Sequence, residues 1–101
     1  MDNTLNILGL AYKARKAVLG EEIFNRISKV RLIFLASDLS EKSRERYEKK
    51  CFYYNIEHID AYDSEQLSTS LGKNNVKTVG ITDEGFARSI MKNQVKEVEN
   101  G

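Results

Sequence analysis

The sequence has few of the residues on which crosslinks and catalytic triads depend. Its 101 residues include one cysteine, one histidine, and no proline or tryptophan. Cys51 has no second thiol to pair with, so no internal disulfide or thiolate zinc site is available, and a reducing compartment is expected. His58 would have to serve any Ser-His-Asp or Cys-His arrangement, yet no poised nucleophile stands near it. We therefore expect a structural histidine, a core cysteine, and a protein that is not an enzyme and has neither cofactor nor metal.

Long apolar runs are also lacking, and none approaches the ~20 residues that a membrane span requires. The apolar start "LNILGLAY" is short, follows Asp2 and ends at Lys13, which is atypical of a signal peptide. We expect one cytoplasmic, monomeric domain over residues 1–96 without a membrane partner. A flexible polar tail is expected over residues 97–101.

Helical and strand-like spacings of apolar residues alternate along the chain. The pattern predicts helices over 4–14, 21–31, 64–71 and 83–95, and strands over 17–19, 32–36, 57–62 and 76–82. A long polar helix, capped by Asp38 or Ser40, is expected to reach Tyr54. This alternation favours an α/β fold, a three-layer α/β/α sandwich with a small mixed sheet of about four strands. The phosphate-binding motifs GxGxxG and GxxxxGK are absent, which argues against a nucleotide-binding domain.

Two of the expected helices carry specific predictions about their faces. Ile23, Phe24, Ile27 and Val30 form an apolar stripe typical of one continuous helix. In the long polar helix, Tyr47, Cys51 and Tyr54 are expected to face the core. Its segment "KSRERYEKK" is expected to be a solvated face with pairs four residues apart, such as Glu45 with Lys49.

Aspartates stand near the ends of several expected strands, where α/β folds collect functional carboxylates. They are Asp38, Asp60, Asp63 and Asp83. Helix capping accounts for most of them, because Asp63 and Asp83, and also Asp38, lie just before expected helices. A metal or phosphoacceptor site remains the alternative interpretation.

A basic run without acids, "YKARK", leads into a glycine turn. The run contributes Lys13, Arg15 and Lys16, and the turn is Gly20-Glu21-Glu22. Backbone N–H groups at a helix start can bind phosphate oxygens, and carboxylates there can accept hydrogen bonds from guanine. Acids in a first turn are also what any helix prefers, so capping and RNA recognition both remain open.

Three segments in this order resemble a known family. They are "LNILGLAYKARKAVLGEE", "RLIFLASDLSEKSRERYEKKC" and "LSTSLGKNNVKTVGITDEGFA". Together they resemble the bacterial YlxQ-type proteins, a group in the superfamily of ribosomal proteins L-seven-Ae and L-thirty-e. The resemblance runs from about Leu5 to Met91 and implies an α/β/α sandwich that binds kink-turn or related internal-loop RNA.

The resemblance also implies which residues contact the RNA. Glu22 falls on the family's asparagine, Ile23 on its glutamate and Arg26 on its lysine. A second contact loop would consist of Lys73, Asn74 and Asn75, and Asp38 would lie beside the pocket for an extruded nucleotide. The segment between Gly20 and the next strand is about one helical turn shorter than in the family.

These considerations predict a ribosome-associated RNA-binding protein whose partner is ribosomal RNA or another kink-turn-like element. Its Gly20 turn and 73–75 loop would contact the RNA. The expected phosphate contacts are Lys13, Arg15, Lys16, Arg26 and Lys73. The alternative is a protein–protein adaptor on the same fold that works without nucleic acid.

Overall fold

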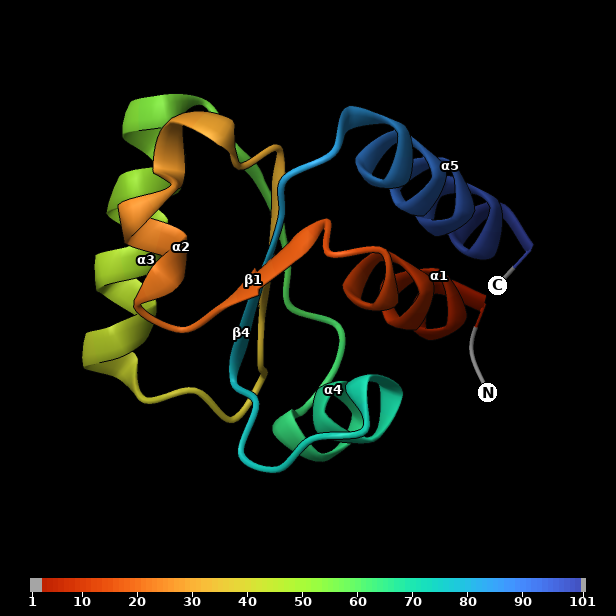
Figure 1. Cartoon of the computed structure of the whole chain (residues 1–101), viewed down its shortest axis with the longest axis horizontal. Coiled ribbons are helices and arrows are strands. Elements are labelled where there is room, and N and C mark those ends of the chain that lie inside the picture. Colours follow the sequence, from red (N-terminus) through yellow and green to blue (C-terminus); the bar gives the residue numbers. More distant parts are fainter. Residues whose placement is uncertain (1–2, 101) are drawn as a thin grey trace.

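The computed structural model describes the backbone of residues 3–100 and the side chains of residues 3–95 (Figure 1). Its elements follow in the order α1 (Asn3–Lys13), β1 (Ala17–Leu19), α2 (Glu22–Asn25), the 3₁₀ turn η1 (Ile27–Lys29), β2 (Leu32–Leu35), α3 (Glu41–Tyr54), β3 (Glu57–Ile59), α4 (Ser64–Leu71), β4 (Thr78–Ile81) and α5 (Glu84–Asn100). The sequence predicts each of these strands, but β3 ends at Ile59 instead of residue 62, and β4 is shorter than the predicted 76–82. Among the helices, α2 and the end of α5 differ from the prediction.

The strands form one mixed sheet in the order β1-β4-β2-β3. Strand β4 is antiparallel to both β1 and β2, whereas β3 runs parallel to β2. The central strands β2 and β4 are buried along their whole length, as the apolar run "LIFLA" predicts for β2.

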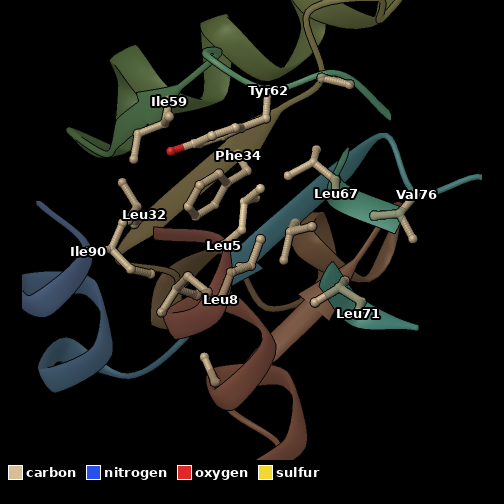
Figure 2. Close-up of a cluster of buried hydrophobic side chains, with 14 of the residues drawn as sticks. Leu5, Leu8, Leu32, Phe34, Ile59, Tyr62, Leu67, Leu71, Val76 and Ile90 are labelled. Carbon is tan, nitrogen blue, oxygen red and sulfur yellow. The ribbon is translucent and has the colours of Figure 1, made fainter. Parts of the chain in front are cut away.

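Helices cover both faces of the sheet and make three layers (Figure 1). On one face, α2 and α3 pack through a buried cluster that includes Ile23, Ile33 and Tyr47. On the other face, α1, α4 and α5 enclose a larger cluster around Phe34 (Figure 2). The predicted α/β/α sandwich with a mixed four-stranded sheet is confirmed.

The two helices at the ends of the described chain, α1 and α5, pack against each other and share polar contacts. Thr4 is fully buried, and its hydroxyl accepts hydrogen bonds from Asn93 Nδ2 at 2.6 Å and Gln94 Nε2 at 2.8 Å. Gln94 also donates to the Tyr62 hydroxyl at 3.0 Å. These bonds satisfy a polar group that would otherwise be costly to bury.

The segment after Gly20 differs from the continuous helix predicted over 21–31. Helix α2 has four residues and gives way at Arg26 (φ −113°, ψ 20°) to the 3₁₀ turn η1. Because a 3₁₀ turn rises ~2.0 Å per residue against ~1.5 Å in an α-helix, the short segment covers more of the sheet's length. Ile23 and Val30 of the predicted stripe are buried, whereas Phe24 and Ile27 are half-buried.

Helix α5 also differs from the prediction, because it runs to Asn100 instead of ending near residue 95. Lysine, glutamine and glutamate after residue 91 are good helix formers, and no glycine or proline interrupts them before Gly101. The segment predicted as a flexible tail is therefore helical over 97–100, and residue 101 lies outside the described residues. The domain boundary at residue 96 stays a prediction.

The side chains of α3 differ from the prediction in two respects. Tyr47 and Cys51 are buried, but Tyr54 is 41% exposed because it ends the helix. The described side chains of α3 form no salt bridge four residues apart. Instead, Arg44 pairs with Asp60, Arg46 with Glu21, and Glu48 with His58, all outside the helix.

The capping interpretation of the strand-end aspartates is confirmed at two positions. Asp63 and Gln66 form a reciprocal capping box at the start of α4, and Gly72 ends that helix at φ +67°. Asp83 accepts a hydrogen bond from the Phe86 amide at 2.9 Å in the first turn of α5. In the described part of the chain, no helix is long and apolar enough to cross a membrane.

Candidate nucleic-acid interface

Three loops meet at one edge of the sheet: the turn after β1, the loop after β2 and the loop before β4 (Figure 1). Because β1 and β2 are both antiparallel to β4, their last residues lie beside the first residues of β4. The Gly20 amide donates to the Thr78 carbonyl at 3.4 Å, and the Ala36 amide to the Lys77 carbonyl at 2.8 Å. The topology thus brings together the Gly20 turn, Asp38 and the 73–75 loop, which we call the loop edge.

Gly20 adopts a left-handed backbone conformation with φ +56°. A Cβ atom built at this position would meet no atom within 4 Å. The glycine is therefore favoured by its backbone conformation, which strains other residues, and not by a lack of space.

Glu21 anchors the turn to α3. It occupies the N-cap position of α2 but its side chain makes no capping hydrogen bond, so the capping interpretation is wrong for Glu21. Its carboxylate binds Arg46 through two contacts of 3.0 and 3.1 Å. The Arg46 guanidinium lies 4.2 Å from the centre of the Phe24 ring, which stacks on Tyr47 at 4.6 Å. These contacts join α2 to α3, and they leave the Glu21 carboxylate bound to Arg46.

Glu22 is exposed and lies at the loop edge. Its Oε1 accepts a hydrogen bond from Asn25 Nδ2 at 3.1 Å. Arg26 follows at the C-terminal cap of α2 and is exposed. Glu22, Asn25 and Arg26 are therefore exposed polar groups of the segment that follows the Gly20 turn.

Ile23 is fully buried and fastens α2 to the sheet. It packs over Gly80 of β4, where a Cβ atom would lie 3.1 Å from Ile23 Cγ1 and 3.4 Å from Val18 Cγ2. The missing side chain at Gly80 thus creates the space that Ile23 occupies. An isoleucine at this position of the glycine turn has a packing role and cannot hydrogen-bond a base.

Asp38 is bound to the start of α4 rather than to that of α3, which Ser40 caps. It accepts hydrogen bonds from the Ser64 amide at 2.8 Å and the Ser64 hydroxyl at 2.6 Å. These bonds favour the charged form and lower the pKa of Asp38 below its ordinary value of 3.8. Asp38 therefore joins the loop after β2 to α4.

The lowered pKa predicts how an Asp38→Asn variant depends on pH. Since the folded pKa lies below the unfolded one, the carboxylate contributes stability above pH 3.8, and this contribution is lost as the pH falls through the folded value. We expect the variant to melt below the wild type at about pH 7 and the difference to vanish at about pH 2. Thermal denaturation followed by circular dichroism across this range tests it, and a pH-independent difference would contradict it.

The 73–75 loop is held in place by Ser68 of α4. The Ser68 carbonyl accepts from the Lys73 amide and its hydroxyl from the Val76 amide, both at 2.9 Å. Asn75 adopts φ +56°, and Lys73 Nζ lies 5.8 Å from the centre of the Tyr12 ring. Lys73, Asn74 and Asn75 are exposed along a polar hollow beside α4, so their side chains are accessible to a ligand.

Arg15 and Lys16 of the basic run do not join the loop edge, whereas Tyr12 at its start lies beside Lys73. Lys16 lies at the other end of β1, where its carbonyl accepts from the Thr82 amide at 2.9 Å. Arg15 precedes it with φ +62°, and Lys13 ends α1. Arg15 and Lys16 are thus separated from Gly20 by the length of β1, ~3.3 Å per residue. The sequence reasoning missed Lys77, which is exposed at the loop edge and whose charge also lowers the pKa of Asp38.

Cys51 and His58, which the sequence offers as candidates for catalysis, have the environments of structural residues. Burial raises the pKa of the Cys51 thiol to about 11, which keeps it protonated. His58 lies 3.8 Å from Glu48 and is half-buried. Among the described residues, no three His, Cys, Asp or Glu side chains are placed to hold a metal ion together.

Comparison with known proteins identifies close relatives of the chain. No protein-family model matches it. It is 32% identical over 87 residues to the RNA-binding protein YlxQ of Enterococcus faecium, and the aligned region covers 83% of this chain and 84% of that protein. It is 33% identical over 88 residues to the RNA-binding protein YlxQ of Bacillus subtilis, and the aligned region covers 84% of this chain and 88% of that protein.

A solved structure of a protein with unknown function from Bacillus halodurans has the same fold. It superposes with a TM-score of 0.85 at 28% identity and covers 92% of this chain and 97% of that one. The similarity to both curated relatives extends over most of each sequence. The chain therefore belongs to the YlxQ family.

Proposed function

We propose that this protein binds a structured RNA internal loop of the kink-turn type, with the loop edge facing the RNA. The observation that carries the proposal is that the sheet topology gathers the Gly20 turn and the 73–75 loop at one edge. Both curated relatives are named RNA-binding proteins, which supports RNA as the partner class. Like them, the protein is a binding protein and not an enzyme.

The groups at the loop edge suit an RNA ligand. Arg26, Lys73 and Lys77 supply exposed positive charges for phosphates. The Glu22 carboxylate accepts hydrogen bonds and so matches the N1–H and amino donors of guanine, while Asn74 and Asn75 can both donate and accept. Glu21 is left out of this set, because Arg46 already binds both of its carboxylate oxygens.

The proposal includes the setting in which binding takes place. We place the protein in the cytoplasm, where a family of RNA-binding relatives and a single buried cysteine are both expected. The proposed target is a ribosomal RNA element, which the protein binds as a monomer. We also propose that the protein belongs to the superfamily of ribosomal proteins L-seven-Ae and L-thirty-e.

The proposal predicts the effect of removing charge from the loop edge. We expect a Lys73→Ala variant to bind an RNA with a G·A internal loop about tenfold more weakly and to reduce the slope of log K against log salt by about one. A Lys16→Ala variant removes the same charge at the far end of β1 and should change both quantities less. Titration at two salt concentrations by fluorescence anisotropy measures them.

The control RNA replaces the G·A pairs with Watson–Crick pairs. Preference for the internal loop supports the proposal. Equal, salt-sensitive binding to both RNAs would reduce the loop edge to a general phosphate-binding surface. If folded protein binds neither RNA, the proposal fails and the adaptor function takes its place.

A further inference from the structure

The outward face of α3 exposes aromatic rings near the end of the helix. Phe52 is 90% exposed and Tyr53 is 79% exposed. Tyr53 packs edge-on against Tyr54 at 5.0 Å, which orders its ring without burying it. Two neighbouring rings exposed to this extent on a small domain point to contact with another molecule.

Basic side chains line the same face. Lys42, Arg46, Lys49 and Lys50 surround a shallow groove together with Glu45 and Tyr53. Over residues 3–95, no salt bridge involves Lys42, Lys49 or Lys50. Four basic side chains against one acidic side chain, Glu45, give the groove an excess of positive charge.

This face is continuous with the loop edge. Helix α3 begins just after the loop that holds Asp38, and Arg46 binds Glu21 of the Gly20 turn. From Lys42 to Tyr53 the helix rises about 16 Å, which matches about five stacked nucleotides at ~3.4 Å each. In Figure 1, α3 lies beside α2 at the left of the molecule, and no other helix or strand lies on its outer side in this view.

We infer that the α3 face is a second RNA contact, which takes a single strand extending from the internal loop bound at the loop edge. Lys42, Lys49 and Lys50 contact the phosphates of this strand, and Phe52 and Tyr53 stack on its unpaired bases. The inference rests on the proposed function for the position of the strand.

The chemistry of the face favours a nucleic acid strand. A line of positive charges that leads to exposed rings is how proteins bind single strands without reading sequence, since every base has a face for stacking. Arg46 supplies the link to the loop edge but is engaged by Glu21 and Phe24. An acidic protein segment would match the charge alone, and it is the competing outcome of the test.

The test compares G·A internal-loop RNAs with and without a single-stranded extension of about six nucleotides, placed at either end. We expect the extension to raise the affinity of the wild type about tenfold. A Phe52→Ala/Tyr53→Ala variant should lose this gain and bind the RNA without extension as the wild type does. Leu10→Ala, which removes a 58% exposed apolar side chain of α1, is the matched control.

An extension of abasic nucleotides separates stacking from charge. It should bind the wild type more weakly than the normal extension, whereas Lys49→Ala/Lys50→Ala should weaken binding of both extensions. If the extension adds no affinity, or if the aromatic variant keeps the gain, the inference is wrong and the face is left to a protein partner. Circular dichroism confirms that each variant is folded.

Binding of the wild type to the RNA without extension tests the proposed function separately. If the wild type does not bind it, the single-stranded segment is titrated alone against the same variants. Binding that the aromatic variant loses would still support the α3 contact, and absence of binding would overturn it.

Discussion

Replacing Phe34 by alanine should lower the free energy of unfolding by about 3–5 kcal/mol, the usual cost of removing a buried phenylalanine ring. Phe34 is fully buried in β2, and its ring lies 6.2 Å from that of Tyr62 (Figure 2). Leucines of α1 and α4 belong to the same cluster, so the cavity would open between the sheet and two helices. Because a domain of this size has only about 5–15 kcal/mol in total, the variant should be close to unfolding.

The same substitution at Phe52 is a matched control. Phe52 is 90% exposed, so Phe52→Ala should change the free energy of unfolding by less than about 0.5 kcal/mol. Urea denaturation of both variants measures the difference, and a Tm shift of roughly 4–8 °C per kcal/mol is expected alongside it. Similar losses for both variants would contradict the placement of these two rings.

The substitution Gly80→Val should destabilise the protein by about 3 kcal/mol and displace the Gly20 turn. Its Cβ atom alone would lie 3.1 Å from Ile23 Cγ1, and its two methyl groups would enter space that Ile23 and Val18 fill. Since Ile23 fastens α2 to the sheet, Glu22 and Arg26 would move away from the loop edge. Loss of stability and of RNA affinity in one variant, measured by denaturation and titration, is the expected result.

A double-mutant cycle isolates this contact. Gly80→Ala and Ile23→Ala should each destabilise the protein, the second by about 2–5 kcal/mol. The combined variant should lose less than the sum, because the methyl group at position 80 then occupies part of the space that Ile23 leaves. Strict additivity would show that Gly80 and Ile23 do not share this space.

Local signals in the sequence predict α4 and the strands well. Asp63, Gln66 and Gly72 mark both ends of α4, and the structure contains the complete capping box. The apolar run over 32–36 likewise predicts a strand that is buried on both faces. In each case the residues that determine the element lie within it, so no distant contact is needed to interpret them.

Two of the predictions that were wrong depend on contacts between distant residues. Glu21 binds Arg46, which is 25 positions away, and no pattern near either residue indicates that pair. Asp38 precedes α3 but binds Ser64, because the topology brings the ends of β2 and β3 to the same edge. Lys49 lacks the predicted partner Glu45. The resemblance indicated the Gly20 turn and the 73–75 loop, while the contacts of their individual side chains follow from the fold.

The pairing of α1 with α5 has a consequence for how the protein is made. The contact joins residues 90 positions apart, as between Asn3 and Asn93, and Leu5 and Leu8 share one buried cluster with Ile90. A nascent chain leaves the ribosome with its amino end first, so α1 emerges long before the helix that covers it. The side of α1 that contacts α5 therefore stays open until α5 has been synthesised and released from the exit tunnel. Completion of this core is thus one of the last events in the synthesis of the domain.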